Sequence, residues 1–249
     1  NTVEFRLSDH YVFEGFDITA GSFRGIYHHA HDITIRDTVV HDCPAHGILG
    51  ADQDSGSLTL EYVEVYHCGN GTGQHPIYIA TDEFAHPGSV FRMQYCYLHD
   101  QNGGNSIKSR AERNEIYYNY VSGGFYGEIE LIGPDPKGNR NVDVDTARED
   151  SDVVGNVFQH SSTQGSRMAR VGSDGTGYTN GRYRFVNNTF ILRQGQTSPA
   201  IEIFEGIESL EMHNNVFFRV GGAPIDKVVL ETRVRWVSGR VSTGSNNWL

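Results

Sequence analysis

The chain has 249 residues, a formal net charge of −11 and 29 glycines. This acidic balance argues against nucleic acid as a partner, because proteins that bind nucleic acid usually carry a basic face. No run of about 18 apolar residues occurs, so we expect no transmembrane helix and no membrane partner.

A short apolar motif recurs along the chain and predicts the fold. In its complete form it reads apolar, two residues, Asn, one residue, apolar, as in Ile116–Val121. The central positions, in chain order, are Phe16, Thr38, Val63, Cys96, Asn119, Asn156, Asn188, Asn215 and Asn247. A fixed motif at variable spacing is typical of a solenoid whose coils carry loops of different lengths. Because the apolar residues alternate in short runs, we expect an all-β, right-handed parallel β-helix of about eight to nine coils.

The asparagines of the motif predict an internal ladder. Equivalent residues on adjacent coils lie about 4.8 Å apart, so their side-chain amides can hydrogen-bond along the solenoid axis. We interpret this ladder as structural. One repeat throughout predicts a single domain over residues 1–249, and its abrupt ends resemble those of a fragment without end caps. Since open strand edges need covers, we expect flanking segments or another copy of the chain there.

The cysteines follow the same register. Cys43 and Cys68 each lie five residues after the central position of their coil, so we expect them to stack on adjacent coils. At that separation they form either a disulfide or two stacked buried thiols. Cys96 occupies the central column and is expected to be a core residue.

The strand that follows each motif carries an inward apolar anchor, and its neighbours point outward because side chains alternate along a strand. The expected anchors are Ile26, Ile48, Ile77, Ile107, Ile129, Met168, Ile201 and Ile225. The informative outward residues of the middle coils are Tyr78, Lys108, Glu128, Glu130 and Arg167. Arg110, two residues past Lys108, belongs to the same face. The alternation therefore predicts a charged strip on one outer face of the solenoid.

Long glycine-containing loops flank these coils. They cover residues 69–75 and 102–105, a stretch of about 18 residues that starts at Gly133, and residues 172–181. Loops of such length in a compact fold are usually functional or disordered. We expect them to wall a groove in which His75, Arg170 and Glu202 contact a ligand.

The charges of the strip suit β-elimination on a uronic-acid polysaccharide. That reaction needs a base, a cation that neutralises the sugar carboxylate, and an acid for the leaving oxygen. Lys108 is the candidate base, because lysine can accept a proton where its surroundings favour the uncharged amine. Glu128 and Glu130 share one face of one strand and are candidate ligands of Ca²⁺, which prefers oxygen donors.

The neutralising cation has an alternative that needs no metal. Arg110 or Arg167 could pair with the sugar carboxylate through two parallel hydrogen bonds. The candidate acids are Tyr78, His75 and Arg167, so Arg167 has two possible roles. In each version the expected partner is an anionic polysaccharide.

Short segments carry a family resemblance. Asn105–Ala111, with Arg113–Ile116 after it and His75–Ile79 before it, resembles secreted bacterial right-handed β-helix proteins of the pectate-lyase-like superfamily. The segment around Lys108 is also similar to that of the chondroitinase B and alginate lyase family. There a lysine is the base, an arginine on the next coil is the acid, and Ca²⁺ neutralises the uronate. The resemblance implies a secreted or periplasmic polysaccharide lyase, although Gly127–Gly133 on the next coil contains no arginine and lacks the family's Arg-His-Gly segment.

Two other functions remain open at this point. A non-catalytic polysaccharide-binding or tailspike-like module would share the fold, because function depends on the site that a fold carries. A glycoside hydrolase on this fold would need two or three aspartates facing the groove. Asp143 and Asp145 are placed in a loop by the repeat, and the strip offers glutamates instead.

Overall fold

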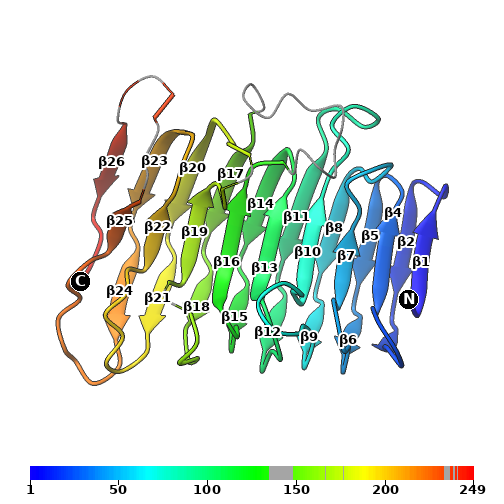
Figure 1. Cartoon of the computed structure of the whole chain (residues 1–249), viewed down its shortest axis with the longest axis horizontal. Helices are drawn as coiled ribbons and strands as arrows, with labels where there is room; N and C mark the ends of the chain where they lie inside the picture. Colours follow the sequence, from blue (N-terminus) through cyan, green and yellow to red (C-terminus); the bar gives the residue numbers. More distant parts are fainter. Residues whose placement is uncertain (135–147, 166, 176, 233–235, 238, 240) are drawn as a thin grey trace.

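The chain folds into a right-handed parallel β-helix, which confirms the prediction from the repeat. The computed structural model describes residues 1–134, 148–165, 167–175, 177–232, 236–237, 239 and 241–249. Their regular elements are all strands, stacked in parallel along the solenoid from the N-terminal to the C-terminal coils (Figure 1). Within this described part of the chain, no helix is long and apolar enough to cross a membrane.

Three sheets run along the solenoid, and each full coil contributes one strand to each sheet. Sheet A contains β1 (Val3–Arg6), β4 (Ile26–His29), β7 (Ile48–Gly50), β10 (Ile77–Ala80), β13 (Asn105–Arg110), β16 (Gly127–Ile132), β19 (Ala169–Gly172), β22 (Ile201–Ile203) and β25 (Val229–Glu231). Sheet B contains β2 (Tyr11–Glu14), β5 (Ile33–Arg36), β8 (Leu58–Glu61), β11 (Val90–Gln94), β14 (Arg113–Tyr117), β17 (Asp150–Val154), β20 (Gly181–Val186), β23 (Ile207–His213) and β26 (Ser242–Ser245). Sheet C contains β3 (Asp17–Thr19), β6 (Val39–His41), β9 (Glu64–Tyr66), β12 (Tyr97–His99), β15 (Tyr120–Ser122), β18 (Val157–Gln159), β21 (Thr189–Leu192) and β24 (Val216–Arg219).

The core consists of columns of apolar side chains, one residue from each coil. In sheet A the column runs Ile26, Ile48, Ile77, Ile107, Ile129, Ala169, Ile201 and Val229. Two expected anchors are therefore wrong, because Ala169 replaces Met168 and Val229 replaces Ile225. Met168 and Ala169 are both apolar and fully buried, so the sequence pattern could not show that Ala169, one residue later, is the one that pairs with Ile129.

The asparagine ladder forms as predicted. Asn119 donates its side-chain amide to the Asn156 Oδ1 atom at 2.9 Å, and this contact repeats coil by coil to Asn247 at 2.9–3.0 Å. Each Oδ1 also accepts the backbone N–H of the asparagine on the preceding coil. The buried amides thus satisfy one another, which removes the cost of placing polar groups inside the solenoid.

All three cysteines are free and buried, which decides between the two alternatives for Cys43 and Cys68. Their thiols hydrogen-bond to each other, as expected for stacked positions on adjacent coils. Cys96 is 3% exposed within the apolar core, in agreement with its place in the central column.

A buried carboxyl pair lies near the turns between sheets A and B. Glu83 follows β10 and Glu149 immediately precedes β17, and their carboxyl groups interact directly. Glu149 is 1% exposed, and neither of its carboxyl oxygens receives a hydrogen bond from another group. Because two carboxylates offer no donor, a hydrogen bond between them requires a proton on one of them. Burial is the main cause that raises the pKa of Glu83 to about 7, and it raises the pKa of Glu149 well above its usual value.

Candidate functional site

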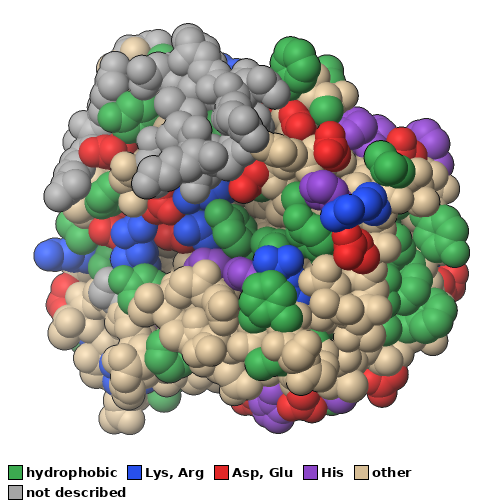
Figure 2. Space-filling view, turned by 45° about the vertical axis from the view of Figure 1, so that its right-hand side comes forward, with side chains coloured by type: hydrophobic (Ala, Val, Ile, Leu, Met, Phe, Trp, Pro, Cys, Tyr) green, Lys and Arg blue, Asp and Glu red, His purple; other side chains and the backbone are tan. Residues whose placement is uncertain are grey.

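A polar groove of about 330 Å³ lies on the outer face of sheet A at the middle coils. Its lining residues are Thr72, His75, Asn105, Lys108, Tyr126, Glu130, Arg167, Arg170 and Asp174. Figure 2 shows basic and acidic side chains gathered with histidines in a hollow of one face of the molecule. The groove therefore brings together most of the site residues expected from the sequence.

A row of outward side chains, one from each of five consecutive strands of sheet A, passes through the groove, and its three middle residues line it. In order, these residues are Tyr78 on β10, Lys108 on β13, Glu130 on β16, Arg170 on β19 and Glu202 on β22. The alternating charges pair directly. Lys108 Nζ lies 3.3 Å from Glu130 Oε2, and Arg170 Nη1 donates to Glu130 Oε1 at 3.0 Å. Arg170 occupies this row because the register begins at Ala169.

Two arginines extend the row on either side. Arg110, which is 3% exposed, donates its Nε hydrogen to the Tyr78 hydroxyl oxygen at 3.0 Å and another hydrogen to the Gly133 carbonyl. Arg167 lies two residues before the anchor Ala169, rather than one, yet its Nε atom still reaches Glu202 Oε2 at 3.1 Å. The groove thus holds four guanidinium or ammonium groups within one connected network.

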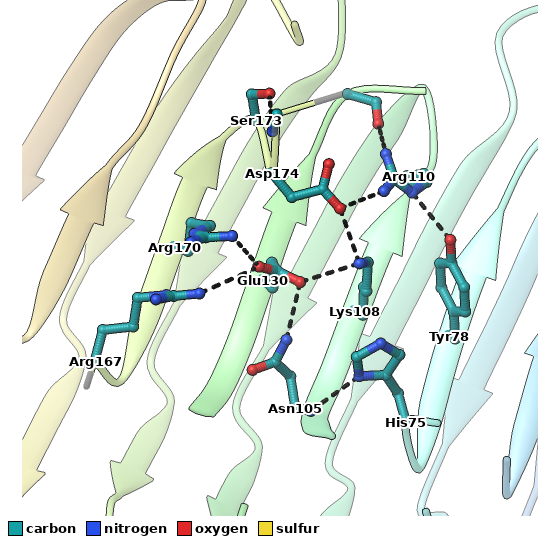
Figure 3. A network of polar contacts seen from close by, with 12 residues as sticks. His75, Tyr78, Asn105, Lys108, Arg110, Glu130, Arg167, Arg170, Ser173 and Asp174 are labelled. Carbon is teal, nitrogen blue, oxygen red and sulfur yellow. Dashed lines mark hydrogen bonds and ion pairs between the residues drawn. The ribbon is translucent and has the colours of Figure 1, made fainter. Parts of the chain in front are cut away.

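One member of the network was not identified from the sequence. Asp174 follows β19 in a loop, and its Oδ2 atom lies 3.0 Å from Lys108 Nζ and 2.5 Å from Arg110 Nη2. Figure 3 shows Asp174 meeting these two cations, while Arg167 and Arg170 approach Glu130 from the other side. The glycines around residues 172–181 marked the loop as a wall of the groove, but no local pattern marks the aspartate in it.

His75 contributes a neutral ring to the groove. It is 3% exposed, and its Nδ1 atom accepts the backbone N–H of Asn105 at 2.9 Å. Burial holds the pKa of His75 well below its usual value, and the nearby charges of Lys108 and Arg110 add to this effect. With Nδ1 engaged as an acceptor, the neutral ring carries its proton on Nε2, so it offers a donor rather than a base.

The two candidate calcium ligands lie in different surroundings. Glu128 is fully buried, accepts hydrogen bonds from Ser106 and the Gly124 backbone at 3.1 Å each, and contacts His160 at 3.1 Å. Burial raises the pKa of Glu128. Glu130 instead meets the basic side chains and the Asn105 amide at 2.9 Å. In the described part of the chain, no group of three or more His, Cys, Asp or Glu is arranged to hold a metal ion.

The comparisons with known proteins give no relative from which a function could be transferred. No family model matches the chain, no curated protein matches it, and no solved structure matches it. Asp143 and Asp145, which a hydrolase would bring to the groove, lie outside the described residues. The functional argument therefore rests on the chemistry of the groove.

Proposed function

We propose that the groove binds a uronic-acid polysaccharide and cleaves it by β-elimination, with Lys108 as the base. The supporting observation is the convergence of four basic side chains in a protein whose net charge is −11. These are Lys108, Arg110, Arg167 and Arg170. Three acidic partners, Glu130, Asp174 and Glu202, leave the network with one net positive charge (4 − 3 = 1).

The shape of the site suits a chain-like ligand. The row from Tyr78 to Glu202 crosses five strands, which at about 4.8 Å per strand spans roughly 19 Å along the solenoid axis. A polysaccharide lying along this row would meet basic groups at two places, beside β13 and beside β19, which are two coils apart. A small anion would contact only one part of the row.

The proposed reaction assigns one role to each of three neighbouring residues. Arg110 pairs with the sugar carboxylate, which acidifies the proton on the adjacent carbon. Lys108, as the free amine, takes that proton, the carbon–oxygen bond to the next sugar breaks, and a carbon–carbon double bond forms. Tyr78 gives its hydroxyl proton to the leaving oxygen. This donation is feasible because the Tyr78 oxygen accepts its hydrogen bond from Arg110, so the O–H is not used in that contact.

A non-catalytic binding module is the second candidate, and one observation favours it. Lys108 contacts two carboxylates, Glu130 at 3.3 Å and Asp174 at 3.0 Å. In these ion pairs Lys108 acts as a cation, whereas a base must be uncharged when it accepts a proton. Binding of an anionic chain needs only the charged form.

The test is to incubate the protein with alginate, pectate, glycosaminoglycans and ulvan and to follow the ultraviolet absorbance of unsaturated uronate. The comparison uses Lys108→Ala, with Lys227→Ala as the control because Lys227 is exposed outside the groove. Loss of a general base typically slows a reaction by about 10²–10⁴-fold, so Lys108→Ala should lose activity on this scale while the control retains it.

Each alternative has its own signature in this assay. Unchanged cleavage by Lys108→Ala would refute the assignment of the base. Oligosaccharide binding without an unsaturated product would favour the binding module. New reducing ends without the absorbance of unsaturated uronate would indicate hydrolysis.

A further inference from the structure

The Asp174 carboxylate holds a distinctive position in the groove. It bridges Lys108 and Arg110 through one oxygen, Oδ2, at 3.0 and 2.5 Å. In the proposed reaction these are the two residues that must face the sugar carboxylate and the carbon beside it. An internal carboxylate therefore lies where the ligand's carboxylate is required.

The attachment of Asp174 also differs from that of the other groove carboxylates. Glu130 and Glu202 project from β16 and β22, where the ladders of sheet A hold their backbone. Asp174 belongs to a loop between two glycines with positive φ, +104° at Gly172 and +97° at Gly175. Glycine adopts such conformations without the strain that side chains impose. Gly175 also has open space around it, which suits the backbone beside Asp174 to adjustment, whereas Gly172 packs closely against the Glu205 carbonyl.

Charge balance points in the same direction. With Asp174 in place, the four basic and three acidic groups of this network in the described part of the chain carry one net positive charge. Withdrawal of Asp174 would leave two positive charges among them (4 − 2 = 2), and one external carboxylate would restore the original balance. Such an exchange replaces one carboxylate partner of Lys108 and Arg110 by another.

The position of Asp174, its place in a loop and the charge of the network support one inference. We infer that, when no ligand is bound, the Asp174 carboxylate occupies the place of the ligand's carboxylate. Lys108 and Arg110 form a carboxylate subsite, and Asp174 competes for it. The inference rests on the proposed function for its choice of uronates, and it adds that the subsite recognises one carboxylate group. Neutral sugars gain nothing from the withdrawal of Asp174.

The test measures the affinity of wild type and Asp174→Ala for sodium acetate, sodium glucuronate and methyl glucoside by NMR titration. A ligand's apparent affinity falls in proportion to the fraction of molecules whose site is open. If the subsite is open in about a tenth of the molecules or fewer, Asp174→Ala should bind acetate and glucuronate about 10-fold more tightly or better. The affinity for methyl glucoside should not change.

Two further variants control for the folding and the geometry of the loop. Asp174→Asn removes the charge with almost no change in size, so it should also bind the two carboxylates more tightly. Asp174→Glu keeps the competing group and should stay close to wild type. Circular dichroism verifies that each variant is folded. Unchanged acetate affinity in folded Asp174→Ala and Asp174→Asn would overturn the inference.

The outcome is independent of the cleavage assay. Tighter acetate binding by Asp174→Ala, with no polysaccharide cleaved, would support the subsite and leave the lyase proposal without support. Cleavage by wild type, with unchanged acetate affinity in Asp174→Ala, would support the lyase and refute the role of Asp174.

Discussion

The buried carboxyl pair predicts how stability depends on pH. The pKa of Glu83 rises from its usual value of 4.5 to about 7, chiefly through burial, and Glu112 nearby raises it further. A raised pKa means that the folded protein holds the proton more tightly than the unfolded chain does. The stability that the shared proton contributes is therefore fully present below pH 4.5 and is lost as the pH rises through about 7.

Replacement of Glu83 by glutamine should remove the part of this dependence that Glu83 causes. The amide does not titrate, and it can donate to Glu149 at any pH. At about 1.4 kcal/mol per pH unit, the rise from 4.5 to about 7 corresponds to about 3 kcal/mol. We expect Glu83→Gln to exceed wild type in free energy of unfolding by about 3 kcal/mol at pH 8, and to differ from it by less than about 1 kcal/mol at pH 5.

The assay is urea denaturation followed by circular dichroism at pH 5, 6, 7 and 8. Glu14→Gln serves as the control, because it makes the same chemical change at an exposed position of β2. The difference between Glu83→Gln and wild type should grow as the pH rises, whereas the control should show no such growth. A difference that is the same at pH 5 and pH 8 would refute the raised pKa of Glu83, as would a variant less stable than wild type at pH 8.

Two further predictions concern the interior of the solenoid. Asn156→Ala removes an interior member of the ladder and, at about 1 kcal/mol per lost hydrogen bond, should lower the free energy of unfolding by about 3–5 kcal/mol. Asn247→Ala removes three such hydrogen bonds at the more exposed end and should lower it by about 2–3 kcal/mol, and equal losses in urea denaturation would contradict the ladder's role. Burial raises the pKa of Cys96 to about 12, so at pH 8 iodoacetamide should modify it only after unfolding. Modification of Cys96 in the folded protein, detected by peptide mass spectrometry, would contradict its burial.

The fold could be predicted because its main signal repeats on almost every coil. The asparagine ladder and the strand period together determine which residues stack, and the register of sheet A was correct through Ile129. The prediction failed at Met168, where two adjacent apolar residues are both buried and the pattern could not select between them. A shift of one residue exchanges the faces of a strand, so the outward position beside Glu130 belongs to Arg170 and not to Ala169.

Only those contacts of the candidate site that join residues on strands could be predicted from the sequence. Lys108 and Glu130 meet because parallel strands place equivalent residues side by side, which the repeat alone implies. Asp174 lies 66 residues from Lys108 and reaches it through the conformation of a loop. Loop conformation depends on packing that no repeat encodes. The Glu83–Glu149 contact was missed for the same reason, since both residues lie outside the strands.

The asparagine ladder also has an electrical direction. From Asn119 to Asn215, one side-chain N–H of each asparagine donates to the following coil, and from Asn156 to Asn247 each side-chain oxygen accepts from the preceding one. Five amide dipoles are therefore aligned head to tail, and such chains polarise one another cooperatively. Only a side chain that both donates and accepts can continue this line. Aspartate has nearly the same shape, but a column of carboxylates would repel itself, so the chain of dipoles requires the uncharged amide.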